Sequence, residues 1–584
     1  MQRLSLCVLV LLFATSSAMA ANDNNANDAK APSTTEAGPS PKGASAASPS
    51  ENELRELRDL LLEQQKRIEE LESEVSEMKR ASVPTPTGPA ASGAATVSPA
   101  ATSTAPLATA APALPAAAAS PAAVASSGAT LASDSQGDQH APLSFKIGDA
   151  EFTPGGFLDF SSFTRTENLG SGIATSFGTV PFKGSQQAAL TESRLSSQYS
   201  RLSLKVHADV NNSTSVTGYV EADFLGFQPA NAYETANSNS LRERVYWVDV
   251  RHGKWEVLGG QEWSMLQPNR VGISPDTPDV FYTQNEDPNF QVGLIWARQA
   301  QFRVVYHANN WWTLGASIEN PDQFVPASVV FPADSFASQF DNGSGSTSAT
   351  SAGTNTASPT LHPDIIVKTA FDWKPFGHSA HVEASGLIRS FKVYNTLAAP
   401  AATNTITGGG GSLNANFELF NNFRLIGNSF YSCGGGRYIF GLGPDVVVRP
   451  DGNLSCVHSG SGIGGFEWQT TPKYMVAGYY GAAYYQRNFG LLPATGSPTP
   501  TCDGQVGFTC VGFGFPGSAD TANRAVQEAT FDFIPTLWSS PYYGKLQLIT
   551  QYSYLTRAPW WVATGSPKNA HLSMIYIDVR YVLP

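Results

Sequence analysis

The sequence predicts an all-β domain of 16 antiparallel strands closed into a barrel, preceded by a short polar helix and a long linker. Three observations support this class. From residue 143 onward apolar and polar residues alternate along segments of about ten residues, the connections between these segments alternate between short and long, and the number of segments is even. Alternation with a period of two is typical of strands with one apolar and one polar face.

Residues 1–20 are predicted to be a secretory signal peptide. The segment MQRLSLCVLVLLFATSSAMA carries a basic residue, an apolar run from Leu6 to Ala14, and small residues at Ala18 and Ala20 before the expected cleavage point. The apolar run is too short to span a membrane as a helix. We therefore expect export from the cytoplasm.

Two segments of biased composition flank a short polar helix. Residues 21–50 contain few large apolar side chains and are expected to be disordered, because they cannot bury enough apolar surface to offset the entropy lost on ordering. Residues 81–142 are rich in Ala, Pro, Ser and Thr and are expected to form an extended linker.

Between them, residues 51–80 are predicted to form a parallel coiled coil. A heptad repeat over this segment places an almost entirely apolar seam at the a and d positions. The seam residues are Leu54, Leu57, Leu61, Gln64, Ile68, Leu71, Val75 and Met78.

The flanks of the seam also favour self-association. The g and e positions pair with opposite charge between parallel chains, as for Glu53 with Arg58 and Glu74 with Lys79. Ser50 and Glu53 fit a capping box at the start of the helix. A lone solvated helix is the alternative, and the repeat leaves open whether two or three chains associate.

The barrel prediction begins with one hairpin. Arg201 to Val210 places Leu, Val and Ala on one face and Ser, Lys, His and Asp on the other, and the segment from Ser215 repeats this pattern after a short turn. A soluble β-sandwich gives the same alternation, so this hairpin alone does not distinguish the two classes.

The whole chain does distinguish them. Candidate strands lie near Gly156, Arg201, Ser215, Leu241, Trp255, Arg298, Trp312, Asp364, His381, Gly411, Phe423, Gly465, Tyr474, Asn523, Gly544 and Ala570. Short turns alternate with loops of about 15 to 45 residues, for example 320–363 and 431–464. An even number of strands of about ten residues, with short turns at one end and long loops at the other, is the pattern of a bacterial outer-membrane barrel.

Aromatic residues agree with a membrane location. They make up 11% of the chain, and several, including Trp311-Trp312, Trp373 and Trp560-Trp561, fall at predicted strand ends. Such residues form belts at the two membrane interfaces of outer-membrane barrels. The sequence therefore predicts a transmembrane barrel over residues 143–584, with the N-terminal region in the periplasm of a Gram-negative-type bacterium.

Three segments resemble a known family. GGQEWS (259–264), RQAQFRVVY (298–306) and SIENP (317–321), after a signal peptide, a coiled coil and an Ala/Pro linker, resemble the DcaP-like porins of Gram-negative outer membranes. The resemblance implies a homotrimer with periplasmic coiled coils. It also implies passive uptake of small hydrophilic solutes, often anionic ones such as dicarboxylates.

A pore constriction is predicted at the third long loop, which follows the fifth strand. In porins related to this family the loop folds inward, and charges at such a narrow point select ions. The candidate residues are Asp276, Asp279, Glu286 and Asp287 on the loop and Lys205, Arg242, Arg244, Arg298 and Arg303 on the facing wall. The alternative is that these charges are ordinary solvated wall residues.

The sign of ion selectivity stays open. The net charge is −12, but a channel is governed by its narrowest part rather than by its total charge. The acidic loop favours cations, whereas the family resemblance favours anions.

Two disulfides are expected in the exported chain. Four cysteines remain after the signal peptide, and they form two close pairs in predicted loops, Cys433 with Cys456 and Cys502 with Cys510. Close pairs of cysteines in an exported protein are typical of local disulfides. Zinc binding is the alternative, but the spacings are irregular and no histidine stands at ligand spacing beside a CxxC motif.

Catalytic motifs are lacking in the sequence. It contains no GxSxG, HExxH or GxxxxGK motif, so we expect no enzyme activity, cofactor, metal or nucleic-acid partner. His378, His381 and Glu383 form an HxxHxE run, but only His381 and Glu383 share a strand face, which favours wall residues over a metal site. The alternative function is a structural anchor that links the outer membrane to the cell wall through the coiled coil.

Deleting residues 51–80 tests the role of the helix. If the helix holds subunits together, its loss should lower the temperature at which the oligomer dissociates on a semi-native gel. An oligomer of unchanged heat resistance would leave the helix only a tethering role.

Overall fold

The computed structural model describes residues 143–226, 239–341, 359–440, 442–494 and 500–584. The predicted signal peptide, the segment 21–50, the coiled coil with its seam, and the linker 81–142 lie outside the described residues.

The barrel has 16 antiparallel strands, as predicted. In chain order they are β2 (Ala150–Arg165), β4 (Arg201–Asn211), β5 (Thr214–Asp223), β6 (Arg242–His252), β7 (Trp255–Trp263), β8 (Arg298–Asn309), β9 (Trp312–Glu319), β10 (Asp364–Trp373), β11 (Ala380–Asn395), β12 (Ala402–Phe420), β13 (Phe423–Cys433), β16 (His458–Thr471), β17 (Tyr474–Tyr485), β22 (Asn523–Ser540), β23 (Gly544–Pro559) and β24 (Ala570–Val582). Each predicted strand position falls in one of them or, for Leu241, one residue before β6.

The first strand closes the barrel. Residues 150–157 of β2 pair with β4, and residues 157–165 pair with β24. Two short strands also pair with β2: β1 (Phe145–Ile147) pairs with its start, and β3 (Glu192–Ser196) pairs with its end. Since every wall strand has a neighbour on both sides, the backbone groups are satisfied within the sheet, as a membrane requires.

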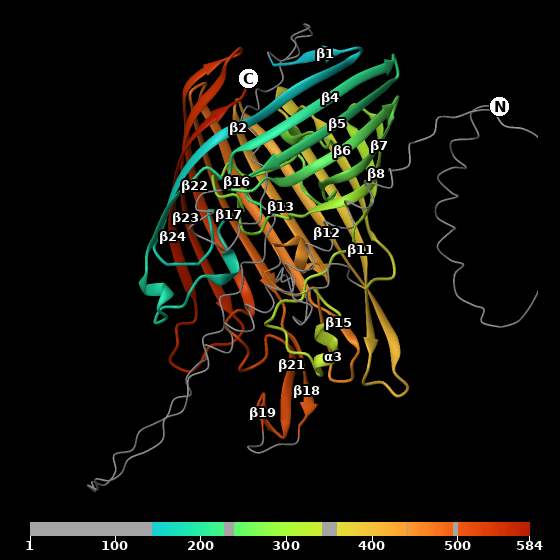
Figure 1. Cartoon of the computed structure of the whole chain (residues 1–584), viewed down its shortest axis with the longest axis vertical. Coiled ribbons are helices and arrows are strands. Elements are labelled where there is room, and N and C mark those ends of the chain that lie inside the picture. Colours follow the sequence, from blue (N-terminus) through green and yellow to red (C-terminus); the bar gives the residue numbers. More distant parts are fainter. Residues whose placement is uncertain (1–142, 227–238, 342–358, 441, 495–499) are drawn as a thin grey trace, which may run out of the picture. The chain divides into compact units, whose positions relative to one another are not determined.

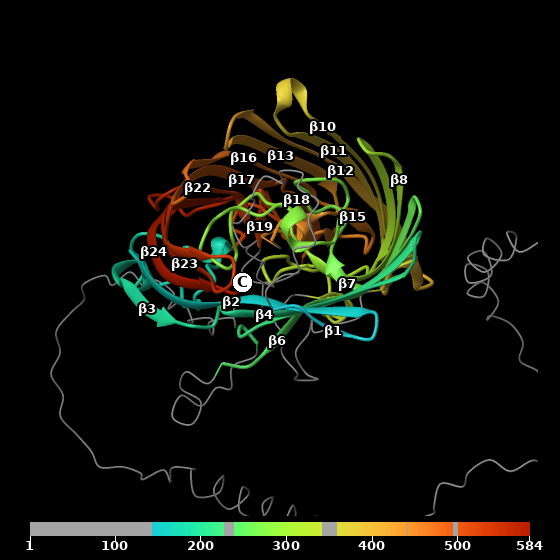
Figure 2. The same cartoon turned by 90° about the horizontal axis from the view of Figure 1, so that it is seen from above.

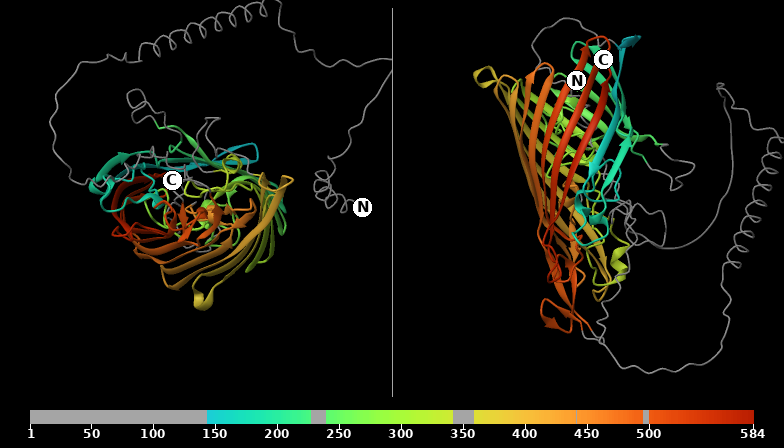
Figure 3. Two further views of the ribbon diagram at one scale, coloured as in Figure 1. Left: turned by 90° about the horizontal axis from the view of Figure 1, so that it is seen from below. Right: turned by 90° about the vertical axis from the view of Figure 1, so that its left-hand side faces the viewer.

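The two ends of the barrel differ. In Figure 1, β1 and the C terminus lie at one end, while α3 (Asp334–Ala337), β15 (Leu454–Cys456) and β18 (Asn488–Pro493) lie at the other. We call these the short-turn end and the long-loop end. The wall strands coloured orange and red run from the C terminus towards the long-loop end (Figure 3).

The remaining elements are short. They are η1 (Phe177–Thr179), η2 (Gln187–Ala189), η3 (Thr277–Asp279), η4 (Pro375–Gly377), η5 (Gly436–Tyr438), β14 (Val446–Val448), β19 (Thr501–Cys502), β20 (Gln505–Val506) and β21 (Phe508–Phe513). Within the described residues, no helix is long and apolar enough to cross a membrane.

Strand and loop lengths differ from the prediction. The strands vary from 8 residues in β9 to 19 in β12 rather than staying near ten. As a result, β11 and β12 are joined by residues 396–401 only, and the loop expected over 431–464 is limited to 434–457. Antiparallel pairing continues beyond the expected ends because β11 and β12, and β13 and β16, remain in register there.

A long inserted loop packs inside the barrel. Residues 264–297, here called the third loop, connect β7 to β8, and their large apolar side chains, such as Leu266, Phe290 and Trp296, are buried. Wall residues that face inward, such as Leu258 and Ile366, are buried with them in the same apolar cluster. Figure 2, viewed from above, shows green chain inside the ring of strands. The inside of the barrel is therefore partly an apolar core, a feature that alternation alone did not predict.

Both predicted disulfides are present. Cys433 at the end of β13 bonds to Cys456 in β15, and Cys502 in β19 bonds to Cys510 in β21. Each pair closes a local loop at the long-loop end. Cys433 belongs to a wall strand rather than to a loop, because β13 extends farther than predicted.

Candidate functional site: the third loop inside the barrel

The third loop touches the barrel wall at β4 and β5 through polar contacts. Lys205 Nζ on β4 donates hydrogen bonds to both carboxylate oxygens of Asp276, at 2.9 and 3.0 Å. Next to it, Thr277 Oγ1 donates to the hydroxyl of Tyr219 on β5 at 3.3 Å. The Lys205 and Asp276 side chains are 37% and 42% exposed, so both of these candidate residues lie beside water.

The loop is also anchored across the barrel on β16 and β17. The Arg270 guanidinium donates two hydrogen bonds to the Glu467 carboxylate, at 2.8 and 2.7 Å. Tyr479 OH donates to Glu467 at 2.9 Å and accepts from the backbone N–H of Gln284 at 3.1 Å. Burial alone would lower the pKa of Arg270, but the adjacent Glu467 charge outweighs it and raises that pKa. Arg270 therefore stays charged.

A third anchor holds the loop to β2 and β24. Arg580 donates hydrogen bonds to Glu286 at 2.6 Å and to Asp159 at 2.7 Å, and its Nε lies 3.6 Å from Asp578. Ser161 Oγ donates to Glu286 at 2.9 Å. Glu286 is fully buried, so this predicted constriction residue faces protein rather than water.

Three carboxylates share one guanidinium at this anchor. Ligand oxygens of Asp159, Glu286 and Asp578 lie within 4.8 Å of one another, a spacing that could hold a metal ion. Arg580 already contacts all three, so the geometry is that of a salt-bridge cluster. Burial raises the pKa of Glu286 well above its usual range, Arg580 opposes this shift, and the other two carboxylates add to it.

Asp287 lies beside this anchor and is also fully buried. It accepts hydrogen bonds from the Thr175 N–H at 3.2 Å and from the Tyr576 hydroxyl at 3.1 Å. Burial raises its pKa, and Arg165 opposes the shift. Like Glu286, Asp287 holds the loop to the wall.

The HxxHxE run belongs to a further anchor. His381 on β11 contacts Asp372 at 2.8 Å and Glu383 at 3.2 Å. These two carboxylates accept the backbone N–H groups of Gly272 and Asn269 in the loop. The run therefore positions the loop, whereas His378 lies outside this group in the turn between β10 and β11.

The other predicted wall cations form a cluster near β5. Arg244 donates to Glu221 at 2.6 Å and to Asp223 at 2.9 Å, and Arg242 Nε donates to Asp223 at 2.9 Å. The Arg298 guanidinium lies 5.5 Å from the centre of the Trp263 ring. Among the described residues, no carboxylate lies in ion-pair contact with Arg298.

Two further candidate residues, Arg303 and Asp279, lie outside the ion pairs described above. Arg303 on β8 is only 4% exposed. Asp279, at the end of η3, accepts the backbone N–H of Arg270 through its carbonyl, and burial raises the pKa of its carboxyl. The structure thus brings Lys205 to Asp276, pairs Arg242 and Arg244 with Asp223 and Glu221, and places Arg298 over the Trp263 ring.

Several anchors were not among the predicted site residues: Glu467, Tyr479, Arg580 and Gln551. The side-chain oxygen of Gln551, on β23, accepts the backbone N–H groups of Glu286 and Asp287. Alternation places their side chains on the inner face, and this signal was available in the sequence. Their loop partners lie 183 to 294 residues away along the chain, and no local pattern links positions so distant.

Two glycines allow the closest approach of loop and wall. A Cβ at Gly481 on β17 would lie 1.8 Å from the carbonyl oxygen of Val292, and a Cβ at Gly293 would lie 2.3 Å from that of Gly462. Gly293 also has φ +95°, a backbone conformation that other residues rarely adopt. The loop and the β16–β17 wall are therefore in direct backbone contact.

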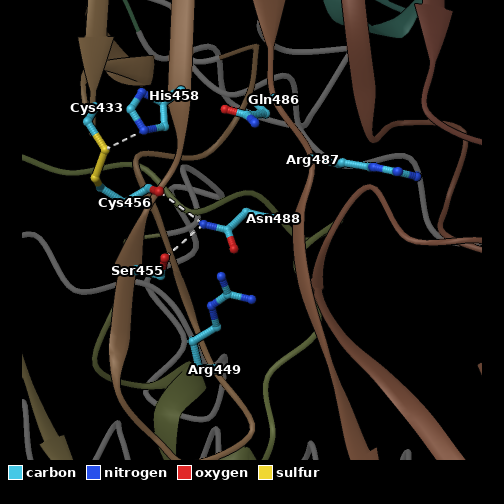
Figure 4. A pocket seen from close by; sticks show the side chains of 8 residues that line it. All are labelled: Cys433, Arg449, Ser455, Cys456, His458, Gln486, Arg487 and Asn488. Atoms are coloured by element: carbon cyan, nitrogen blue, oxygen red, sulfur yellow. Dashed lines mark hydrogen bonds between the residues drawn. A yellow bond between two sulfur atoms is a disulfide. The ribbon is translucent and has the colours of Figure 1, made fainter.

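A separate polar pocket opens at the long-loop end (Figure 4). It is lined by Cys433, Arg449, Ser455, Cys456, His458, Gln486, Arg487 and Asn488. Asn488 Nδ2 donates to Ser455 Oγ and to the Cys456 carbonyl, both at 3.0 Å. The pocket lies where the Cys433–Cys456 loop meets the start of the loop after β17.

The variant Gly481→Ala should release the third loop. The added methyl group overlaps a backbone oxygen, and overpacking of this kind costs about 1–3 kcal/mol, so loop opening should rise about tenfold or more. Trypsin cleavage after the buried Arg270 measures the opening. Gly464→Ala, where an added Cβ meets nothing within 4 Å, is the matched control. Equal resistance of the two variants would contradict the role of the contact.

The variant Glu286→Gln should flatten the pH dependence of stability. The raised pKa means that protonated Glu286 favours the folded barrel, so its contribution is full below the usual carboxyl range and is lost as pH rises through the raised pKa. Between pH 5 and pH 9, the Tm of the wild type should fall by roughly 1–4 °C more than that of the variant. Parallel curves from scanning calorimetry would contradict this assignment.

Comparisons with known proteins agree with the fold. The chain is similar to the crystal structure of the outer membrane channel DcaP of Acinetobacter baumannii, with a TM-score of 0.52, 16% identity, and coverage of 75% of this chain and 99% of that chain.

Two further solved structures match more weakly. An anion-selective porin from Comamonas acidovorans matches with a TM-score of 0.40, 11% identity, and coverage of 74% and 100%. OprB from Pseudomonas putida matches with a TM-score of 0.40, 10% identity, and coverage of 74% and 94%. These two scores are too low to carry an argument about this chain. No protein-family model and no curated protein sequence matches it. The chain thus has a 16-stranded barrel fold that resembles that of the DcaP channel.

Proposed function

We propose that this protein is an outer-membrane porin, a water-filled channel for the passive diffusion of small hydrophilic solutes. The observation that carries the proposal is the third loop, which lies inside a closed barrel and contacts the wall at three places, on β4, on β16 and on β24. Such a loop narrows the lumen to a route whose charges act on a partly dehydrated ion.

The proposed constriction lies beside the Lys205–Asp276 pair. Both side chains are more than a third exposed, whereas Glu286 and Asp287 are buried on the wall. We therefore assign Asp276 and Asp279 to the water-facing edge of the loop, with Lys205 facing them from β4, and Glu286 and Asp287 to the attachment of the loop.

Anionic solutes such as dicarboxylates are the proposed class. The Arg298 guanidinium, held over the Trp263 ring, has no ion-pair partner among the described residues, and the neighbouring cations Arg242 and Arg244 share the wall. Carboxylates match the planar fork of a guanidinium. The neutralised variant Arg298→Gln should then lower the permeability of a dicarboxylate more than that of a neutral sugar.

The proposal extends to the assembly and the compartment. The barrel would form a homotrimer in the outer membrane, with the N-terminal coiled coil in the periplasm, as the resemblance to DcaP-like porins implies. The even strand number and the short-turn end that carries both barrel termini support the outer-membrane placement.

Ion conductance of the purified protein in a planar bilayer tests the function. Wild-type protein should open stable channels, and Lys205→Gln should shift the permeability ratio towards cations, because it removes the cation beside Asp276. A unit charge at about 8 Å in water contributes about 0.5 kcal/mol, so the shift should be roughly twofold.

Lys254→Gln is the matched control for this measurement. Lys254 lies in the exposed turn between β6 and β7 and donates to the Ala308 carbonyl, so its loss should leave the ratio unchanged. Channels with equal ratios in both variants would remove Lys205 from the constriction. Absence of any conductance would contradict the proposed porin function and favour the alternative, a structural anchor between the outer membrane and the cell wall.

A further inference from the structure

The outer surface of β17, β22, β23 and β24 presents an apolar band. Outward-facing side chains on these strands, among them Tyr480, Phe531, Tyr552 and Ile575, are about half exposed. In an outer-membrane barrel such a band faces the lipid chains, and aromatic residues mark its edges at the level of the headgroups.

Trp560 stands at the long-loop edge of this band, directly after β23. Its indole N–H donates to the Tyr485 carbonyl at 3.0 Å, which fixes the plane of the ring. Tyr484 contacts it edge to face, with ring centres 6.1 Å apart. The two rings form a fixed aromatic surface at the expected headgroup level.

Two guanidinium groups lie over this one indole ring. Arg487 is 5.6 Å and Arg524 is 5.9 Å from the ring centre of Trp560, and Arg487 is also 5.8 Å from the Phe489 ring. Both arginines are exposed. Figure 4 shows that the Arg487 side chain is directed away from the Cys433–Cys456 disulfide and from His458.

These two arginines differ from the arginines inside the barrel in their charge partners. Inside the barrel, Arg165, Arg270, Arg389 and Arg580 each have carboxylate partners. Within the described part of the chain, no carboxylate forms an ion pair with Arg487 or Arg524. Two like charges near one ring repel each other, so an external anion would stabilise both.

Phosphate is the anion that this arrangement fits. Arginine forks bind phosphate oxygens through paired hydrogen bonds, and stacking on an aromatic ring limits the freedom of the fork. Basic residues beside a lipid-facing surface recognise anionic headgroups. A phosphate on a lipid would contact both the arginines and the adjoining apolar band, whereas a free anion in solution would contact the arginines alone.

We propose that Arg487 and Arg524, held over Trp560, form a binding site for the phosphate group of a lipid in the outer leaflet. The apolar band below the site receives the acyl chains, and the two guanidinium groups hold the headgroup. This inference rests on the proposed outer-membrane placement, since that placement puts the long-loop end at the outer surface.

Native mass spectrometry of the detergent-purified protein tests the site. The probes are bisphosphorylated lipid A and the same lipid after removal of its phosphates. Wild-type protein should bind the phosphorylated form preferentially, and the double variant Arg487→Gln with Arg524→Gln should lose roughly thirtyfold in affinity, as expected for two basic residues at a charged lipid surface.

The matched control replaces exposed arginines that have no aromatic ring beneath them. Arg194→Gln on β3 combined with Arg251→Gln on β6 removes the same charge and should retain binding. Heat-modifiable mobility on gels verifies that each variant is folded. The difference in binding between the two lipids is measured on wild-type protein, so it tests the proposal even if a variant fails to fold.

Three binding results would overturn the site: equal binding of the two lipids, equal loss of affinity in the control variant, or displacement of the lipid by inorganic phosphate at equal concentration. A changed subunit number in the double variant would also overturn it, because the surface would then be an interface between copies. Channel conductance of the double variant should equal that of the wild type, which separates this proposal from the porin itself.

Discussion

Closure of the sheet through β2 is the constraint on which the rest of the structure depends. One strand supplies two partially offset pairings, residues 150–157 to β4 and residues 157–165 to β24. Because no wall strand keeps a free edge, the polar backbone is satisfied and side chains alone decide what each surface contacts. This separation lets the outer face be apolar while the inner face carries ion pairs that would be costly in lipid.

The third loop then converts the inner face from a water-lined wall into a partly packed interior. Its polar attachments lie at separate places around the ring: Glu467 opposite Arg270, Arg580 opposite Glu286, and the Lys205–Asp276 pair near β4. Between them, apolar residues such as Phe290 and Trp296 are buried against the wall. The acidic residues of the loop thus divide into those that attach it and those that stay beside water.

The fold can be predicted from this sequence more completely than the site. The strict alternation from Arg201 to Val210 and the even strand number have a direct geometric cause, and the 16-stranded barrel follows from them. The disulfides could be predicted because the paired cysteines are near each other in the sequence. The burial of Glu286 could not be predicted from the sequence, because its partner Arg580 lies 294 residues away along the chain. The extra length of β12 was also missed, since pairing beyond the membrane leaves no hydropathy signal.

The distant contacts of the third loop bear on the order of assembly. The loop is connected to β7 and β8, yet its partners include residues of β16, β22, β23 and β24. Contacts of such high sequence separation form late, because the intervening chain must be ordered first. We therefore expect the loop to remain undocked while most of the wall is built, and to reach its final position when the C-terminal strands complete the ring. Packing of the barrel interior is then expected to be the last step of barrel formation rather than an early one.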